Sequence, residues 1–273
     1  MMTILKMTAT ALAAGAFALG AQAAEPVGQI LSYTRSNIDG SEPETIHVYR
    51  QSHTRIVVNK RVSPCTTSAL VTADLDATGR QAARLTAGKL NRQGGQDAFG
   101  EIVHDAATGR VDLRINPPGA PPGTEIKAST VVEGQPWMLY DFDLADFSAS
   151  LQARPDPKAD FSFGAALLWP GEDPGKLLKA LGPLNARFVG EETWRGRPAY
   201  RFEVGGPAFA KKGGVGGPLW LDKTAGFVLG AQWSLPNHQE YRDYSLTLDQ
   251  TRTGDDATWT ALMMEHWTGC GSK

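Results

Sequence analysis

Few side chains in this 273-residue sequence have the spacing that known catalytic or metal-binding motifs require. His47 and His53 are six residues apart, and His104 and His266 each adjoin an acidic residue. None of them forms a His-Glu-x-x-His motif or belongs to a calcium loop rich in Asp and Asn. No Gly-x-Ser-x-Gly elbow marks a serine nucleophile. We therefore predict no metal ion and no cofactor, and we assign no catalytic residue.

Two pairs of acidic residues come nearest to an acid–base site. Asp74 and Asp76, like Asp141 and Asp143, are spaced so that both members share one face of a strand, as two glycosidase carboxylates could. We interpret both pairs as turn or cap residues, because a catalytic pair also needs an acid with a raised pKa. An enzyme of unrecognised type would require a pocket that joins Asp141 or Asp143 with a histidine.

The glycine-rich run KKGGVGG at 211–217 resembles a phosphate-binding loop only superficially. It lacks the Gly-Lys-Ser/Thr ending and the helix that should follow. We predict a hairpin loop there, and we interpret His266, in an apolar context, as a core histidine with satisfied hydrogen bonds.

The chain has two cysteines, Cys65 and Cys270. In an oxidising compartment such a pair usually forms a structural disulfide, which would join the first third of the chain to its last strand. Two free buried thiols or a redox pair are the alternatives, although the Cys-x-x-Cys spacing of redox sites is absent.

The N-terminus predicts that compartment. Lys6 precedes a weakly apolar run over 7–20, and Ala21-Gln22-Ala23 follows. A positive start, a short apolar stretch and an Ala-x-Ala exit are typical of a secretory signal peptide. We expect residues 1–23 to be removed near Ala23 and the protein to be periplasmic. Because the expected cleavage site has no cysteine, we expect no lipid anchor. No later apolar run is long enough for a membrane-spanning helix.

Composition narrows the range of partners. The chain has 27 basic and 29 acidic residues, a formal net charge of −2. This balance argues against a nucleic-acid partner, which would call for a strong positive bias. The sequence indicates no oligomeric state.

Glycine and aspartate recur between extended runs and predict an antiparallel sheet with short turns. These turns are expected at 39–40, 76–79, 105–109, 195–196, 222–226 and 253–256. Apolar residues alternate along 200–204 and 227–235, which is the strand period. We also predict a last strand over 259–267 that is apolar on both sides. The predicted fold is mainly β (β-rich α+β), with a strongly curved antiparallel sheet or incomplete barrel.

Two short helices complete the prediction. One spans 174–181, with Asp173 as N-cap, Pro174 at the first position and Gly182 at the end. The other spans 143–152, where Leu144, Phe147 and Leu151 have helical spacing. The run 137–142 before it is predicted as a strand.

The mature chain, residues 24–273, is expected to form one β-rich domain. The Pro/Gly-rich segment 116–123 either divides it in two or is a long loop within one sheet. All seven tryptophans lie between residues 137 and 267, so the large apolar side chains are concentrated in the second half.

A stretch between Phe188 and Trp233 resembles a known family. It reads FVGEETWRGRPAYRFEV and then GGPLWLDKTAGFVLGAQW. This hairpin pattern is similar to that of bacterial periplasmic curved-sheet proteins of the lipoprotein-carrier (localisation factor) superfamily. The resemblance implies a sheet wrapped into an incomplete barrel, short helices over its opening, and a concave apolar side that receives acyl chains.

On this basis the leading hypothesis is non-catalytic binding of a hydrophobic or amphiphilic envelope component, either a lipid or an acylated protein. The candidate residues lining its site are aromatic or long and apolar: Trp220, Trp233, Trp259, Met263 and Trp267. The same side chains could instead fill an ordinary core. The second hypothesis is therefore an envelope interaction or scaffold protein without a ligand cavity, and the enzyme of unrecognised type is the third.

Overall fold

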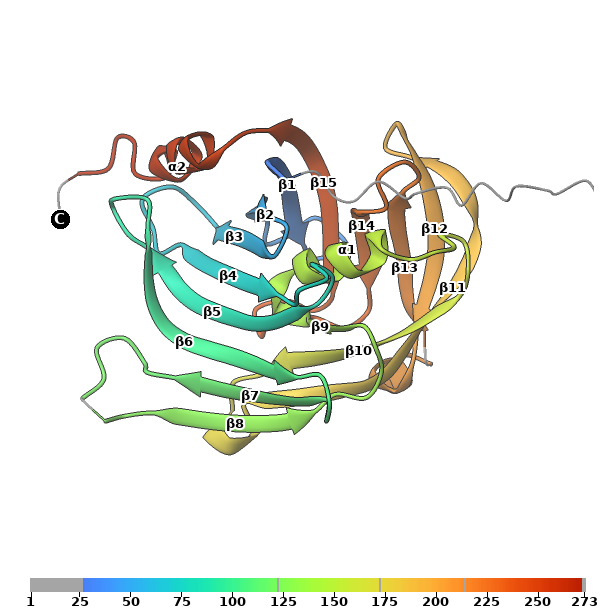
Figure 1. Ribbon diagram of the computed structural model, residues 1–273, viewed down its shortest axis with the longest axis horizontal. Helices are drawn as coiled ribbons and strands as arrows, with labels where there is room; N and C mark the ends of the chain where they lie inside the picture. Colours follow the sequence, from blue (N-terminus) through green and yellow to red (C-terminus); the bar gives the residue numbers. More distant parts are fainter. Residues whose placement is uncertain (1–26, 122, 172, 214, 272–273) are drawn as a thin grey trace, which may run out of the picture.

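The computed structural model describes residues 27–121, 123–171, 173–213 and 215–271 (Figure 1). The predicted signal peptide, residues 1–23, and its cleavage site near Ala23 lie outside the described residues.

In the described part of the chain, strands dominate and helices are short. The strands are β1 (Gln29–Ser36), β2 (Glu44–Ser52), β3 (Arg55–Arg61), β4 (Ala69–Leu75), β5 (Ala82–Leu90), β6 (Gln96–Asp105), β7 (Arg110–Ile115), β8 (Ile126–Val131), β9 (Trp137–Leu139), β10 (Phe161–Leu168), β11 (Leu178–Trp194), β12 (Arg197–Gly205), β13 (Val215–Asp222), β14 (Val228–Trp233) and β15 (Tyr244–Thr253). The helices are α1 (Ala145–Gln152), α2 (Asp256–Glu265) and the 3-10 turns η1 (Tyr140–Phe142), η2 (Pro174–Lys176) and η3 (Pro207–Lys212).

The fifteen described strands form one strongly curved sheet, which confirms the predicted fold class (Figure 1). Its order is β8-β7-β6-β5-β4-β3-β2-β1-β15-β14-β13-β12-β11-β10-β9. Neighbours are antiparallel except β9 and β10, which are parallel and are connected through α1. Five of the six predicted turns connect adjacent strands, and the sixth precedes α2. The segment 116–123 connects β7 to β8, which are also neighbours in the sheet.

The concave side of the sheet is occupied by the segment 137–152, which we call the plug. It comprises the edge strand β9, then η1 and α1 (Figure 1). Its side chains are buried. The plug is tied to the surrounding strands and turns: the Trp137 Nε1–H donates to the Ala82 carbonyl at 3.0 Å, and the Gln152 amide donates to the Ala225 carbonyl at 3.0 Å. The interior is therefore filled by the chain itself. The predicted helix over 143–152 is present as α1, whereas the predicted strand over 137–142 is a strand only at 137–139 and continues as the 3-10 turn η1.

The second helix, α2, covers the opposite, convex face. Side chains alternate along a strand, so β1 to β5 present one apolar row to the plug and another outward. Trp259, Leu262 and Met263 of α2 pack on that outer row. The outer row consists of Ile30, Tyr49, Val57, Leu70 and Leu90. The protein thus has two cores, one on each face of the same strands.

Two predicted elements are wrong. Only η2 forms where a helix over 174–181 was expected, because Leu178 and the residues after it pair with β10. A helix that short gains too little from its own hydrogen bonds to compete with a sheet edge. The predicted last strand is the helix α2, which begins after Asp255, whose carboxylate accepts a hydrogen bond from the Thr258 N–H at 2.9 Å.

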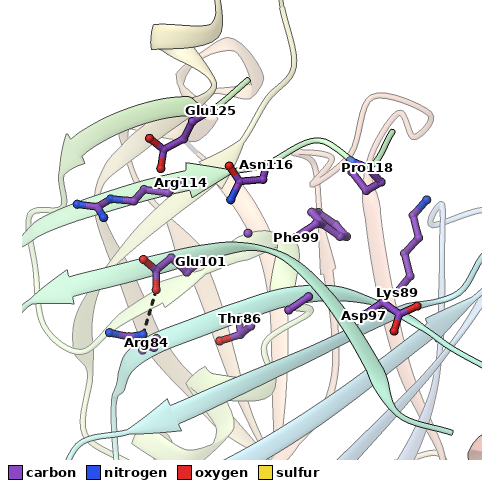
Figure 2. A pocket seen from close by; sticks show the side chains of 12 residues that line it. Arg84, Thr86, Lys89, Asp97, Phe99, Glu101, Arg114, Asn116, Pro118 and Glu125 are labelled. Atoms are coloured by element: carbon purple, nitrogen blue, oxygen red, sulfur yellow. Dashed lines mark ion pairs between the residues drawn. The ribbon is translucent and has the colours of Figure 1, made fainter. Parts of the chain in front are cut away.

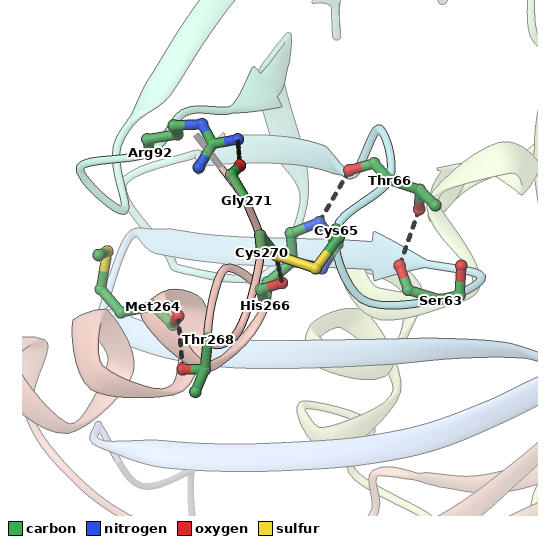
Figure 3. The surroundings of a disulfide bond; sticks show 9 residues. All are labelled: Ser63, Cys65, Thr66, Arg92, Met264, His266, Thr268, Cys270 and Gly271. Atoms are coloured by element: carbon green, nitrogen blue, oxygen red, sulfur yellow. Dashed lines mark hydrogen bonds between the residues drawn. A yellow bond between two sulfur atoms is a disulfide. The ribbon is translucent and has the colours of Figure 1, made fainter. Parts of the chain in front are cut away.

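The predicted disulfide between Cys65 and Cys270 is present, with the Cα atoms 5.5 Å apart (Figure 3). Cys65 lies after β3 and Cys270 after α2, so the bridge fastens the end of the helix to the sheet rather than joining a last strand. His266 lies beside the bridge and is buried, and its Nε2 is 2.8 Å from the Thr66 carbonyl oxygen. His266 is therefore buried, as predicted, but its hydrogen bonding is only half satisfied, because its Nδ1 has no hydrogen-bond partner.

Candidate functional site

A groove lies where the curved sheet fails to close. The edge strand β8 approaches η2 and β11 across the open side of the sheet. The groove there has a volume of about 470 Å³. Its walls are mainly apolar and consist of Ile115, Ile126, Leu168, Pro170, Pro174 and Leu177. Its polar lining consists of Asp141, Asp173, His238, Gln239 and Glu240. We call this the seam groove.

The plug contributes the acidic side chain of Asp141 to the lining of the seam groove. After β9 the chain turns through η1, and Asp143 and Leu144 both adopt left-handed backbone conformations, with φ of 52° and 62°. Such conformations are unfavourable for residues other than glycine and cost about 1–3 kcal/mol each. The turn places Asp141 in the groove lining and directs Asp143 into the protein interior.

Asp143 is the centre of a buried ionic cluster. Its Oδ2 lies 2.5 Å from Lys60 Nζ and its Oδ1 lies 3.7 Å from Arg35 Nε. The Asn237 amide also donates to Asp143 Oδ1, at 2.9 Å. Burial acts to raise the pKa of Asp143, but Lys60 and Arg35 outweigh it and hold the pKa below its ordinary value. Asp143 is therefore a carboxylate, and it neutralises much of the buried positive charge.

Arg35 has further partners on the other side of this cluster. Its guanidinium donates to the Asn237 side chain, lies 3.4 Å from Glu44 and stacks on the Tyr241 ring at 3.3 Å from the centroid. Arg35, Glu44 and Tyr241 also line a smaller hollow of about 260 Å³. This hollow shares His238 and Glu240 with the seam groove.

Asp141 differs from Asp143 in charge state. Burial raises its pKa to about 7, although the Leu168 N–H donates to its Oδ1 at 2.7 Å and Lys60 lies nearby. Lys60 donates to the Asp141 backbone carbonyl and is already paired with Asp143. Near neutral pH the Asp141 carboxyl is therefore divided between its protonated and ionised forms.

His238 responds to the same surroundings in the opposite direction. Burial and then the neighbouring Lys60 lower its pKa to about 3, although Asp143 opposes this change. Its Nε2 lies 3.5 Å from Lys60 Nζ. The ordinary order of aspartate and histidine pKa values is thus reversed between Asp141 and His238, and His238 is an uncharged imidazole at neutral pH.

The structure does not bring the five candidate lining residues together. Trp233 faces the plug, with its ring among those of Tyr140, Phe163, Phe209 and Tyr244. The other four candidate residues do not belong to this ring cluster.

Trp220 stacks on Trp194 with ring centroids 5.1 Å apart, and its Nε1–H donates to Glu192 at 2.5 Å. It alternates with Leu219, which lies in the interior core, so the Trp220 ring lies on the outer face of the sheet. Trp259 and Met263 belong to α2, and Trp267, just after it, packs against the same outer core. Sequence reasoning did not identify Lys60, Arg35 or His238 as site residues.

A larger hollow, of about 620 Å³, lies over β5, β6 and β7 (Figure 2). Its lining is polar and charged, with Lys89, Asp97 and Arg114 among its side chains. Arg84 and Glu101 pair across it at 3.0 Å, but their side chains are 54% and 32% exposed. Exposed ion pairs contribute little free energy, and open charges in water do not select a ligand strongly. The seam groove is the better candidate.

The remaining acidic residues have structural roles. Asp76 accepts hydrogen bonds from the Thr78 and Arg80 N–H groups in the turn after β4, as predicted for a turn residue. Asp74 pairs with Arg55 at 2.7 Å on the surface. Within the described ranges, no three His, Cys, Asp or Glu side chains are grouped so that they could hold a metal ion.

Comparison with known proteins assigns no family. No family model matches the chain, and no curated protein matches it significantly. Among the residues that the structure describes, no helix is long and apolar enough to cross a membrane.

Proposed function

We propose that this protein is exported to the periplasm and binds, without catalysis, a small hydrophobic or amphiphilic component of the envelope, such as a lipid or the acyl group of a protein. The observation that carries the proposal is the seam groove, whose walls are mainly apolar and whose lining includes the buried carboxyl of Asp141 and several exposed polar groups. The Cys65–Cys270 disulfide supports an oxidising compartment.

The seam groove suits one chain rather than several. Its volume of about 470 Å³ falls within the range of about 300–1,000 Å³ that is typical of small-molecule sites. Ile115, Ile126 and Leu168 offer an apolar wall to a chain, and Asp141 and His238 offer hydrogen-bonding groups to a head group. The binding site proposed here therefore differs from the tryptophan-lined concave surface expected from sequence, which the plug occupies.

The proposal is tested with the purified full chain and a matched pair of variants. Solvent extraction and mass spectrometry should recover a bound amphiphile, and N-phenylnaphthylamine, an uncharged fluorophore, should bind in the groove. Ile126→Lys places a charge in the groove wall, whereas Val131→Lys changes an exposed residue of the same strand. We expect Ile126→Lys to weaken binding at least about tenfold, which is ~1.4 kcal/mol, and Val131→Lys to leave it unchanged.

Two results would overturn this function. One is a protein that carries no extractable amphiphile and binds no fluorophore, which would favour the scaffold hypothesis. The other is equal weakening by both variants, because the loss would then reflect the added charge and not the groove.

Acid–base catalysis is a second candidate, and one observation favours it. The lining of the seam groove includes both Asp141 and His238, and the pKa of Asp141 leaves its carboxyl partly protonated and partly ionised near pH 7. A group with a pKa near the working pH is suited to proton transfer, whereas the low pKa of His238 makes it a weak base there. Ester hydrolysis is a reaction this pair could support: the ionised form of Asp141 takes a proton from a water molecule that attacks the ester carbonyl and returns it to the leaving alcohol, while the uncharged imidazole of His238 positions that water.

Turnover of p-nitrophenyl acyl esters distinguishes catalysis from binding. Catalysis predicts p-nitrophenol release that Asp141→Asn and His238→Ala each abolish while fluorophore binding survives. Release that is the same for the wild type and both variants would exclude this pair as catalysts.

A further inference from the structure

The charges around the seam groove are unevenly distributed. Among the described residues that line it, three carry carboxyl groups, Asp141, Asp173 and Glu240, and His238 is the one basic residue. The imidazole is uncharged at neutral pH because burial and Lys60 lower its pKa. A head group that enters the groove therefore meets acids without a free cation in the lining.

The nearby cations are already engaged. Lys60 pairs with Asp143 and donates to the Asp141 carbonyl. Arg35 contacts Asp143 and Glu44 and stacks on Tyr241. Neither lines the seam groove, and both are buried.

One exposed cation lies near the mouth of the groove. Lys176 pairs with Asp173 at 3.4 Å, and its side chain is 81% exposed. A charge so open to water is strongly screened. It offsets Asp173 in part and leaves Asp141 and Glu240 without a cationic partner in the lining.

We propose that the seam groove selects amphiphiles with a protonated amine head, the ammonium group lying beside Asp141 and Glu240 and the alkyl chain along Ile115, Ile126 and Leu168. The inference rests on the proposed binding function and names its ligand class. An ammonium group donates three hydrogen bonds, and the carboxylates of Asp141 and Glu240 can accept them. A carboxylate or phosphate head would instead meet like charges, which is electrostatically unfavourable.

Three ligands with the same octyl chain test the inference: octylamine, octanol and octanoate. Calorimetric titration of the full chain at pH 7.5 and low salt should give octylamine an affinity at least about tenfold higher than that of octanol, with octanoate weakest. The preference should shrink as salt is added, because the interaction is between charges.

Variants locate the preference. Asp141 is the buried acid of the lining, so Asp141→Asn should remove most of the preference for the amine while octanol binding changes by less than about twofold. Glu240 is exposed and its charge is screened, so Glu240→Gln should fold normally and lower the preference only slightly. Glu265→Gln, at an exposed position on α2 outside the groove, is the matched control and should change neither affinity.

The outcomes separate this inference from the proposed function. Equal affinities for octylamine and octanol, or octanoate binding as tightly as octylamine, would overturn the amine selectivity and leave amphiphile binding intact. If none of the three ligands bound, the proposed function itself would fall. A salt-insensitive preference that survives Asp141→Asn would also refute the electrostatic selection.

Discussion

The replacement Asp141→Asn isolates the effect of one buried carboxyl on stability. Burial raises the folded-state pKa of Asp141 to about 7, while the unfolded chain has a value of ~3.9. Between these values the folded protein holds a proton that the unfolded chain releases, so this group stabilises the fold at low pH. The contribution is complete below pH ~4 and is lost as pH rises towards 7.

The size of this loss follows from the two pKa values. Each pH unit within the window changes the free energy of unfolding by ~1.4 kcal/mol. From pH 5 to pH 8 the wild type should therefore lose about 2.5 kcal/mol through Asp141. Asparagine does not titrate, and its side-chain oxygen can still accept the Leu168 N–H. Asp146, whose pKa burial also raises to about 7, remains in both proteins, so its effect cancels in the comparison.

Urea unfolding followed by tryptophan fluorescence measures this difference at pH 5, 6, 7 and 8. The free energy of unfolding of the variant, relative to wild type, should rise by about 2.5 kcal/mol across this range. Asp97→Asn, at an exposed position, serves as the control, and its free energy of unfolding should change with pH as that of the wild type does. If the free energy of unfolding of Asp141→Asn also changes with pH as that of the wild type does, the Asp141 carboxyl does not hold its proton in the folded state and the argument from burial fails.

Three further predictions concern the ionic cluster and the outer core. Lys60→Met should lower the free energy of unfolding by ~3–5 kcal/mol, because it leaves the buried charge of Asp143 without its closest cation. The double variant Lys60→Met, Asp143→Asn should regain at least half of that lost free energy in urea unfolding. If it regains none, the two charges are not coupled. Serine at both Cys65 and Cys270, 205 residues apart, should lower the free energy of unfolding by up to ~5 kcal/mol, and an unchanged urea midpoint would contradict this. Trp259→Ala should cost ~3–5 kcal/mol yet leave fluorophore binding unchanged, since α2 lies on the outer face; weaker binding by the folded variant would refute that separation.

The strands and turns were predictable because their signals are local. Alternating apolar residues and Asp/Gly turns depend on neighbours a few positions away, and most of the predicted turns connect adjacent strands. The cysteine pairing was also predictable, since only two cysteines exist. These features determine the curved sheet but do not indicate what occupies its concave side.

The helices show where local signals mislead. The segment 174–181 has good capping residues, yet pairing with β10 prevails over them. The segment 259–267 was assigned to a strand from alternation, although Asp255 is an N-cap and Trp259, Leu262 and Met263 have the i, i+3, i+4 spacing of a helix. The sequence of this segment has helical spacing, but it was interpreted with the two-residue period of a strand.

The ionic cluster could not be predicted from spacing. Arg35, Lys60, Asp143 and His238 are separated by tens of residues in the chain and come from β1, β3, the plug and the loop after β14. Arg35, Lys60 and His238 appear in the sequence as ordinary surface residues, and Asp143 was noted only for its spacing from Asp141. Only the wrapping of the sheet around the plug brings them together, and that arrangement is set by pairing across the whole molecule.

Polar contacts explain why the plug lies at one depth within the sheet. An apolar segment could slide along an apolar surface at little cost, but the plug has polar atoms that need partners. The Val228 N–H donates to Ser148 Oγ at 3.1 Å, Ser150 donates to the Arg80 carbonyl, and the Tyr140 hydroxyl donates to the Leu235 carbonyl at 2.7 Å. A shift of one residue would leave several buried groups unpaired at ~1–3 kcal/mol each. The same contacts hold Asp141 in the lining of the seam groove, so the packing that closes the interior also positions the groove's buried acid.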